Sequence, residues 1–331
     1  MIKKTFSLSL SLIFLFFTAC TGYTESDSKY IISAMGFERL GEEIIINIQT
    51  LSADEGKEEI TQNAYSFSSS TPIAAFNGAK TRLAKPVTLE HCSAIILSPD
   101  LKREDIINIC EFCKNAERLN TSVYFAVCKD VKGLLECKAV SQAAGGYDIS
   151  AFIETRTEDT GMSYKNRLYE ILSAKEDFSP TFNLPFFIVE DGEFYIDGEY
   201  VYKDFSSFSR LDNTQSLLLS VITNRYSGGN LYIENEAAQI DTAHTYFSAD
   251  LKEDRLYIKL KTKFCFKEHS QNFKNIFESD ALRLLNKKED IYDFAKLLEQ
   301  KERKLFEKIK DNYKEYFNKS IIEYSVEVMV K

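Results

Sequence analysis

The sequence predicts a mixed α/β protein of more than one domain, in which an α/β domain precedes a mostly antiparallel sheet domain with a long C-terminal helix. Strand and helix patterns alternate between residues 71 and 139, which is typical of an α/β domain. Beyond residue 190 strands dominate, and an apolar stripe at helical spacing follows. A chain of 331 residues with 44% hydrophobic residues is long and apolar enough for two or three packed domains.

The first twenty residues are typical of a lipoprotein signal peptide. Two lysines precede an apolar run over residues 6–17, and the small residues Thr18 and Ala19 stand immediately before Cys20. We therefore expect residues 1–19 to be removed and the Cys20 thiol to carry a lipid anchor. The alternative is an ordinary secretory signal with a chance cysteine. A transmembrane helix is disfavoured, because the apolar run is shorter than the ~20 residues that span a bilayer.

The charge of the chain disfavours nucleic acid and anionic membrane surfaces as partners. The formal net charge is −9, and removal of residues 1–19, which hold two lysines and no acidic residue, makes it −11. Phosphate backbones and anionic lipids repel such a surface. No segment after Cys20 is long and apolar enough to cross a membrane, so we expect the rest of the chain to be tethered by its lipid alone.

Residues 20–185 form the predicted N-terminal α/β domain. Residues 21–28 are polar and suit a short tether, and residues 38–41 resemble a turn. The β-branched run 42–51 predicts a strand, and the polar stretch 52–70 is expected to connect it to a helix whose N-terminus the last serines cap. The following elements are expected to alternate as helix 72–83, strand 91–97, helix 103–119, strand 121–128 and helix 131–139.

A domain boundary is expected between residues 185 and 190. Residues 140–180 have the pattern of an amphipathic helix, and Pro180, Pro185 and the acidic turn 190–192 mark the boundary. The C-terminal domain is therefore expected to cover residues 190–331. It can be divided further into subdomains 190–230 and 231–331.

Strands dominate the first part of the predicted C-terminal domain. The aromatic segment 194–201 and the strongly apolar run 215–223 belong to this strand-rich part. The clearest strand is 256–267, where every second residue faces inward: Leu256, Ile258, Leu260, Thr262, Phe264 and Phe266. A long helix over 288–318 carries an apolar stripe that is expected to pack in the core, and a final strand covers 321–330. A partner-binding surface is the alternative for the stripe.

The other face of strand 256–267 is lined by lysines, namely Lys259, Lys261, Lys263 and Lys267. A solvated face that blunts a sheet edge explains them most simply, because charged side chains on an edge strand prevent pairing with other chains. Recruitment of an anionic ligand is the alternative.

The cysteines do not form the pattern of a disulfide scaffold or of a zinc site. Besides Cys20 there are six: Cys92, Cys110, Cys113, Cys128, Cys137 and Cys265. Cys110 and Cys113 form a C-x-x-C pair within a predicted helix, where they could be buried, form a bridge, carry redox chemistry or hold half of a metal site. Zinc would need two more ligands, and the only histidines are His91, His244 and His269. Structural burial is therefore favoured, and no metal is expected.

No catalytic arrangement and no cofactor are predicted. The sequence lacks a nucleophile elbow, the H-E-x-x-H pattern and a phosphate-binding glycine loop. Gly145 and Gly146 are expected to form a turn. His91 stands beside Cys92, but adjacent residues on a strand point to opposite faces and are poorly placed to share a proton. A structural role is therefore favoured for His91.

Several motifs along the chain together resemble one known family. Cys20 is followed by an apolar segment that ends in Gly36 and Phe37, and a helix, a histidine and a buried strand follow over residues 71–97. The most specific stretch is 196–203, which includes Asp197-Gly198, although the family's tryptophan behind the lipid cysteine is missing. In these motifs, and in the order of elements over nearly the whole mature chain, the protein resembles the C subunits of spore germinant receptors, which are lipoproteins of endospore-forming bacteria.

The resemblance implies a multidomain α/β protein with a lipid on Cys20 and no catalytic residue. It also implies two integral-membrane receptor subunits as partners, a position at the outer face of the spore inner membrane, and a role in nutrient-triggered germination. Because no deep polar constellation is visible in the sequence, we expect the acidic domains to bind the partner subunits rather than the nutrient.

Two other functions remain open from the sequence. A solute-binding or other cell-envelope lipoprotein would need a two-lobed α/β fold. A cell-envelope enzyme would need His91, or the pair Cys110 and Cys113, at an accessible site.

Overall fold

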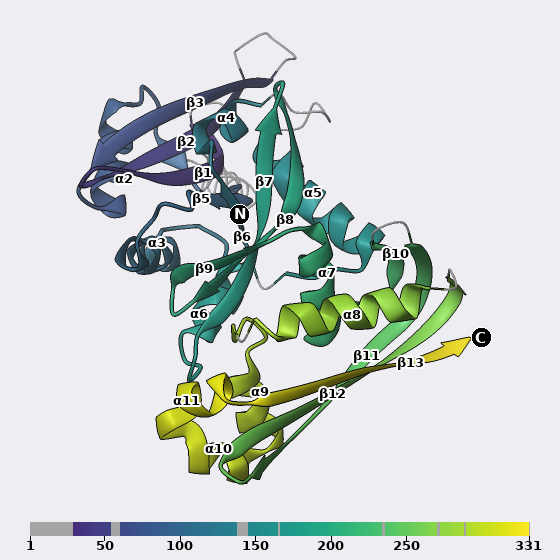
Figure 1. The fold of residues 1–331 in the computed structure, drawn as a ribbon. Coiled ribbons are helices and arrows are strands. Elements are labelled where there is room, and N and C mark those ends of the chain that lie inside the picture. The colour runs from purple at the N-terminus through teal and green to yellow at the C-terminus, as the bar shows by residue number, and fades with distance from the viewer. Residues whose placement is uncertain are drawn as a thin grey trace, which may run out of the picture.

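The computed structural model describes residues 29–53, 60–137, 145–164, 166–233, 236–269, 272–287 and 289–330. Two separate β-sheets with helices packed on them make up this part of the chain (Figure 1). The predicted mixed α/β class is confirmed, with a mixed sheet first and a curled four-stranded sheet with helices after it.

The first sheet has parallel strands in its centre and antiparallel strands at both sides. Its strands are β1 (Tyr30–Leu40), β2 (Glu43–Ala53), β3 (Ile60–Ser69), β4 (Val87–Thr88), β5 (Ala94–Leu97), β6 (Tyr124–Cys128), β7 (Thr181–Glu190), β8 (Glu193–Lys203) and β9 (Ser206–Leu211). Their order is β3-β2-β1-β5-β6-β7-β8-β9, and β4 pairs with the start of β1. Strands β1, β5, β6 and β7 run parallel.

Helices cover both faces of this sheet. One face carries α2 (Pro72–Arg82), α3 (Arg103–Asn115) and α6 (Leu168–Ala174), and the other carries α4 (Val131–Glu136) and α5 (Gly145–Thr160). Residues of the central strands alternate between the two cores, so that Phe125 joins the first and Ala126 the second. The central strands are therefore buried on both sides, as is usual for parallel sheets.

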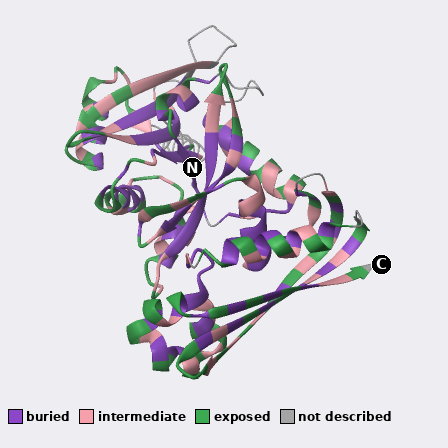
Figure 2. Ribbon diagram, viewed as in Figure 1, coloured by how far each residue is buried: buried purple, intermediate pink, exposed green. Residues whose placement is uncertain are grey.

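Within the described residues, helices cover one face of the second sheet and leave the other face open. It consists of β10 (Gly229–Ile233), β11 (Glu236–Lys252), β12 (Arg255–His269) and β13 (Ile321–Val330), in that order, with β12 and β13 parallel. Its covering helices are α7 (Asn213–Ile222), α8 (Phe273–Leu285), α9 (Phe294–Lys301), α10 (Arg303–Ile309), the 3₁₀ helix η3 (Lys310–Asn312) and α11 (Tyr313–Asn318). Figure 2 shows buried and exposed residues alternating along these strands.

The structure corrects several expectations in the first domain. Strand β1 continues to Leu40, through most of the segment expected as a turn, and β3 forms within the polar stretch 52–70. The polar residues of β3 suit its position at the sheet edge, with one side open to water. Thr71, rather than a serine, caps α2. The expected turn at Gly145 and Gly146 is the first turn of α5, and its close approach to the backbone of Ser33 explains why a glycine stands at position 146.

The second domain also differs from the expectation in its helices. The run 215–223, taken as part of a strand-rich region, forms α7, whose N-terminus is capped by Asp212. The single helix expected over 288–318 is three short α-helices and η3, with breaks near Glu302 and Asn312, and α8 was not predicted. The lysine-bearing strand is β12, which lies inside the sheet and is not an edge. Its lysines instead pair across the strands with Asp241, Glu323 and Glu327.

The first sheet extends beyond the boundary expected between residues 185 and 190. That position falls within β7, and the sheet continues through β8 and β9 to Leu211. Helix α7 then leads to the second sheet, which begins at Gly229. We place the division between the two halves of the molecule at α7.

Two glycines of the family-like motifs have clear structural reasons. A Cβ on Gly36 would lie 2.2 Å from Val131 Cγ1, so glycine lets α4 pack closely on β1. Gly198 has φ +81°, and a Cβ there would lie 2.0 Å from the Leu211 carbonyl oxygen. Only glycine fits both the backbone conformation and the close approach of β9.

Candidate functional site

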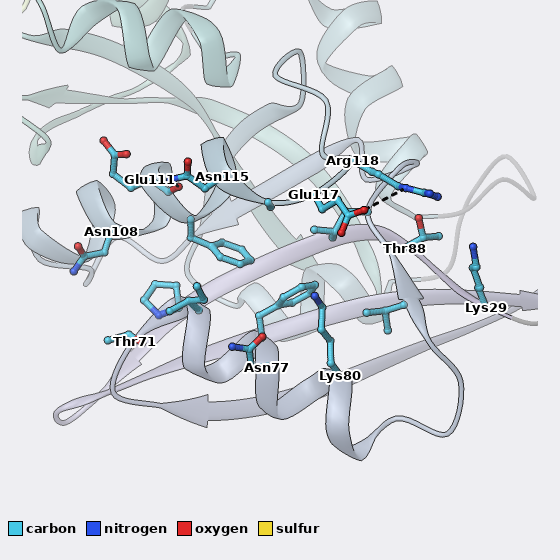
Figure 3. A pocket seen from close by; sticks show the side chains of 17 residues that line it. Lys29, Thr71, Asn77, Lys80, Thr88, Asn108, Glu111, Asn115, Glu117 and Arg118 are labelled. Atoms are coloured by element: carbon cyan, nitrogen blue, oxygen red, sulfur yellow. Dashed lines mark hydrogen bonds and ion pairs between the residues drawn. The ribbon is translucent and has the colours of Figure 1, made fainter.

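An apolar groove runs between α2 and α3 on one face of the first domain (Figure 3). Its volume is about 630 Å³, which is within the usual range of ligand sites. Its floor is made of Pro72, Phe76, Val87, Leu89, Phe112 and Ala116. The rim carries amides, hydroxyls and charged side chains.

Helix α2 forms one wall of the groove. Thr71 Oγ1 accepts a hydrogen bond from the Ala74 N–H at 3.3 Å, and Pro72 occupies the first turn, where its missing N–H costs nothing. Phe76 and Ala79 are buried, whereas Ile73 is 59% exposed. The three positions follow one another at helical spacing, but only part of this apolar stripe is covered. Ile73 is thus an apolar side chain that lines an open groove.

Helix α3 forms the other wall and is fixed by a buried ion pair. Its Asp105 carboxylate accepts a hydrogen bond from the Lys102 N–H at 2.9 Å, which satisfies a donor at the helix N-terminus. Arg39 Nη1, at the end of β1, donates to the same carboxylate at 2.6 Å, and both side chains are largely buried. Charge-assisted hydrogen bonds of this kind hold α3 in place relative to the sheet.

Aromatic rings pack against one another in the floor of the groove. Phe76 of α2 and Phe112 of α3 meet edge to face with ring centroids 5.3 Å apart, and Phe112 also contacts Phe37 of β1 at 6.1 Å. Lys80 Nζ lies 5.0 Å from the centre of the Phe76 ring. Edge-to-face pairs add to the free energy of packing, and a cation over a ring face is attracted to it.

The charges on the rim are unevenly distributed. Figure 3 shows Lys29 and Arg118 towards one end of the groove and Glu111 and Asn108 towards the other. Glu111 is bonded to Lys175 at 2.8 Å, and this hydrogen bond lowers the pKa of the Glu111 carboxyl. The lining contains neither histidine nor cysteine. The groove can therefore bind an amphipathic segment, but its lining offers no group suited to proton transfer at neutral pH.

Comparison with known proteins identifies the family. The family model described as the spore germination protein N-terminal domain matches residues 22–189, just over half of the chain. The chain belongs to the spore germination protein family. A solved structure, the "Crystal Structure of the GerBC protein", is similar to this spore germination protein with a TM-score of 0.53 and 14% identity, over 89% of this chain and 96% of that one. That likeness shows a common fold, and no curated protein matches the sequence.

The only residue predicted to have a chemical role, Cys20, lies outside the described residues. Within the described part of this spore germination protein, no helix is long and apolar enough to cross a membrane. The same part contains no group of three or more histidine, cysteine or acidic residues that could hold a metal ion. His91 is exposed in the turn before β5, and not on the strand where the sequence placed it.

The structure buries the predicted C-x-x-C pair. Cys110 and Cys113 lie on the inner face of α3 and are 2% and 1% exposed, and the six cysteines of the described residues are free thiols. Burial raises the pKa of Cys110 to about 12 and that of Cys92 to about 12. Thiols with such pKa values stay protonated and are poor nucleophiles or metal ligands at neutral pH. The structure therefore supports a packing role for these cysteines.

A buried polar cluster, which the sequence did not reveal, lies near the junction of the two sheets. Glu199 of β8 is 1% exposed, accepts a hydrogen bond from Asn183 Nδ2 of β7, and lies 3.8 Å from Arg225 Nη2. Burial raises the pKa of the Glu199 carboxyl, although Arg225 and Asn183 oppose that shift. The sequence signal was an acidic residue inside a buried strand, in the stretch 196–203. The sequence suggested that the chain has no deep cluster of polar residues. The structure shows that it has one.

Proposed function

We propose that this protein is a lipid-anchored, non-enzymatic C subunit of a nutrient germinant receptor and is needed for spore germination. It is anchored through Cys20 at the outer face of the spore inner membrane and works with two integral-membrane receptor subunits. The observation that carries this proposal is the family match over residues 22–189, which begins two residues after the predicted lipid cysteine. A signal peptide, a lipid cysteine and this domain, in that order, are what an anchored receptor subunit requires.

The tether would keep the α2–α3 groove near the membrane. Lys29 lines one end of the groove and follows Cys20 by nine residues. A chain of that length spans about 30 Å at most, because an extended residue covers roughly 3.3–3.6 Å. The groove therefore lies within reach of the loops and juxtamembrane helices of an integral-membrane partner.

The groove is the surface through which the protein binds one of those partner subunits. Its occupant is an amphipathic helix whose apolar face lies over Ile73, Phe76 and Phe112, a mode of recognition common in helix-binding grooves. The exposed Ile73 gives that helix an apolar side chain to pack against in a rim that is otherwise polar.

The anchor is tested first, with spores that carry Cys20→Ala. We expect the protein to leave the membrane fraction and the spores to lose their nutrient response, because a tethered subunit acts at high local concentration. Loss of membrane partition with a normal nutrient response would contradict the receptor role. Germination triggered by a non-nutrient germinant serves as the control for spore quality.

The groove is tested separately with Ile73→Glu. A buried carboxylate in an apolar interface is strongly unfavourable, so we expect the membrane subunits to be lost from the complex when the protein is purified from spore membranes. The matched control is Leu40→Glu, because Leu40 is 68% exposed in the same domain and lies at the β1–β2 turn. Equal recovery of the partner subunits with Ile73→Glu and with Leu40→Glu would rule out the groove as the contact surface.

A further inference from the structure

The second sheet ends in a long strand, β13, whose outer edge pairs with no other strand in the described part of the chain. On its inner side β13 pairs with β12 over ten consecutive residues, in a parallel register without a bulge. Figure 1 shows β13, in yellow, along the outside of its sheet. Every second residue of an edge strand points its N–H and C=O away from the sheet, so β13 presents a row of backbone donors and acceptors that a further strand can use.

The other sheet edges of the described chain have features that discourage pairing. Strand β9 has six residues and β10 has five, and the longer β3 consists mostly of polar residues. Strand β13 has ten residues, contains no proline, and alternates apolar residues with polar ones. Short length, proline, bulges and charges are the usual means of keeping an edge strand from pairing. Among these four edges, β13 is therefore the best suited to accept another strand.

The charges of β13 are compensated within its own sheet. Glu323 Oε2 lies 3.2 Å from Lys259 Nζ. Glu327 Oε2 lies 2.7 Å from Lys261 Nζ and 3.4 Å from Lys263 Nζ. All three lysines belong to β12, so an incoming strand meets glutamates that already have a cationic partner. Such an edge accepts a strand that does not place another carboxylate directly opposite, because opposed like charges destabilise a pair of strands.

A second copy of β13, running antiparallel, satisfies this condition in one long register. Two identical strands pair about a two-fold axis, and the register centred on Val326 sets Glu327 opposite Ser325. A register centred on Ser325 would instead set Glu323 opposite Glu327 twice, and one centred on Glu327 would oppose that residue to itself. A register centred on Tyr324 would leave the last three residues of the strand unpaired. Charge therefore selects the register centred on Val326 for a second copy.

The same register joins the apolar faces of the two strands. Tyr324 of one copy lies opposite Val328 of the other, and Val326 lies opposite its own equivalent. Tyr324 and Val326 are buried and Val328 is half-buried, on the face that the helices cover. The covered faces of both copies thus lie on one side of the joined sheet, and the open faces lie on the other.

We propose that two copies of this protein pair through the free edges of β13, antiparallel and centred on Val326. The two four-stranded sheets then form one continuous sheet. The pairing surface lies in the second domain, and the α2–α3 groove lies in the first and is not part of it. The inference therefore goes beyond the proposed function.

Self-association is measured with the full chain in mild detergent of matched density, by sedimentation equilibrium. We expect dimers with a dissociation constant below about 0.1 mM. A chain that stays monomeric at every concentration up to about 0.1 mM would overturn the proposal.

The decisive variant is Ser325→Glu. Ser325 is exposed and lies beside Lys261 within its own chain, so the new carboxylate gains a cationic neighbour and the fold is not weakened. Across the pair the same carboxylate faces Glu327 of the second copy, and symmetry repeats this contact. We expect the dimer dissociation constant to rise about tenfold, with an unchanged thermal midpoint in far-UV circular dichroism.

The matched control is Ser248→Glu. Ser248 is exposed on β11, inside the same sheet, and lies beside Lys259 of its own chain. It makes the same change of side chain next to a lysine, but away from the β13 edge, and we expect self-association to stay unchanged. Unchanged self-association with Ser325→Glu, or an equal loss with Ser248→Glu, would overturn the proposal.

The register is tested by cross-linking in a Cys265→Ser background, because Cys265 is the partly exposed cysteine of the described residues. Ser325→Cys combined with Glu327→Cys places thiols opposite each other, with Cβ atoms roughly 4.5–5.5 Å apart, and copper–phenanthroline should link the two chains. Ser325→Cys combined with Glu323→Cys is the control, since these positions are opposite only in the register centred on Tyr324. Linking of neither pair would overturn pairing through β13, and equal or preferential linking of the control would overturn the register.

The outcome is separable from that of the proposed function. A monomeric chain whose Ile73→Glu variant still loses the membrane subunits would leave the receptor role standing and overturn only the pairing of β13. Dimers that form normally while Ile73→Glu has no effect would support the pairing and count against the groove.

Discussion

The two sheets of the molecule differ in how many of their faces are covered. On β6, the neighbouring residues Phe125 and Ala126 are both fully buried, because each faces its own layer of helices. On β12, Phe264 is fully buried, while its neighbour Lys263 faces solvent in part and pairs with Glu327. Both segments are β-strands, but they require different side chains. A strand between two layers of helices needs side chains suited to burial on both faces, whereas a strand with one open face needs polar residues on that face.

The largest expected effect contrasts two neighbours on β12. Phe264→Ala removes a ring that packs against Phe273 and Phe277, and we expect it to lower the free energy of unfolding by about 4 kcal/mol. Lys263→Ala should leave the urea midpoint unchanged, because its side chain lies outside the core. Because the chain has no tryptophan, far-UV circular dichroism is the suitable measurement. Similar losses for the two variants would mean that the outer face is also covered.

A smaller effect is expected from added bulk on the first sheet. Ala126 faces the layer formed by α4 and α5, and Ala126→Leu should cost about 2 kcal/mol because a close-packed core has no room for the extra atoms. Lys259→Leu on the outer face of β12 is the control, and we expect it to leave the urea midpoint unchanged. A tolerated Ala126→Leu would show that the second layer of helices is loosely packed.

A buried chain of hydroxyls in the second sheet predicts a still smaller effect. Thr262 Oγ1 lies 2.7 Å from Thr245 Oγ1 and 2.7 Å from the Tyr324 hydroxyl, and Thr245 Oγ1 donates to the Val221 carbonyl oxygen at 2.9 Å. Thr262→Val keeps the shape but removes two hydrogen bonds inside the sheet, at a cost of about 1.5 kcal/mol in unfolding free energy. Thr242→Val, on the exposed side of β11, should change nothing. Equal midpoints for the two variants would contradict a structural role for the hydroxyl chain.

The smallest effect is expected on the lysine face. Lys261 Nζ lies 2.7 Å from Glu327 Oε2, and this hydrogen bond is the main cause that lowers the pKa of the Glu327 carboxyl. A lowered pKa in the folded state stabilises the fold above the unfolded pKa, and this contribution disappears as pH falls through the folded value. We expect Glu327→Gln to lower the thermal midpoint slightly at pH 7 and low salt. The difference should vanish at about 1 M salt or in acid, and a difference that persists in both would point to packing instead.

The sequence predicted strands best where one face is open. The alternation over 256–267 indicated the buried and exposed residues of β12 correctly, because an open face requires polar residues at every second position. It could not show that β12 lies inside its sheet, since the lysines of an edge strand and those of a cross-strand pair look alike in sequence. The neighbouring glutamates that distinguish these cases lie on β13, about sixty residues away.

The helices of the second domain were predicted less well. The run 215–223 is apolar all round, and such a run fits a buried strand and a buried helix equally. The α7 cap, Asp212 followed three residues later by Gln215, was the available signal for a helix. The long C-terminal stripe was interpreted correctly as core, since Phe306, Ile309 and Tyr313 are buried. Periodicity alone did not reveal that the stripe is divided among short helices.

The cavities of the molecule could not be read from the sequence. The α2–α3 groove depends on Ile73 remaining uncovered within an ordinary helical stripe. A second, smaller cavity is lined by Arg225, Asp293 and Asn183, which come from distant segments and match no motif. The family resemblance rested on motifs along the whole chain and not on one site. The family match over residues 22–189 confirmed it.

The position of β1 has a mechanical consequence. This strand begins at Tyr30, adjacent to the segment that leads to the proposed anchor, and it bonds to β2 on one side and to β4 and β5 on the other. A pull on the anchor would act along the strand and load the hydrogen bonds of both sides in shear, so that they must break together instead of one after another. If Cys20 carries the proposed anchor, the protein is thus attached through a strand that is hydrogen-bonded along both of its sides.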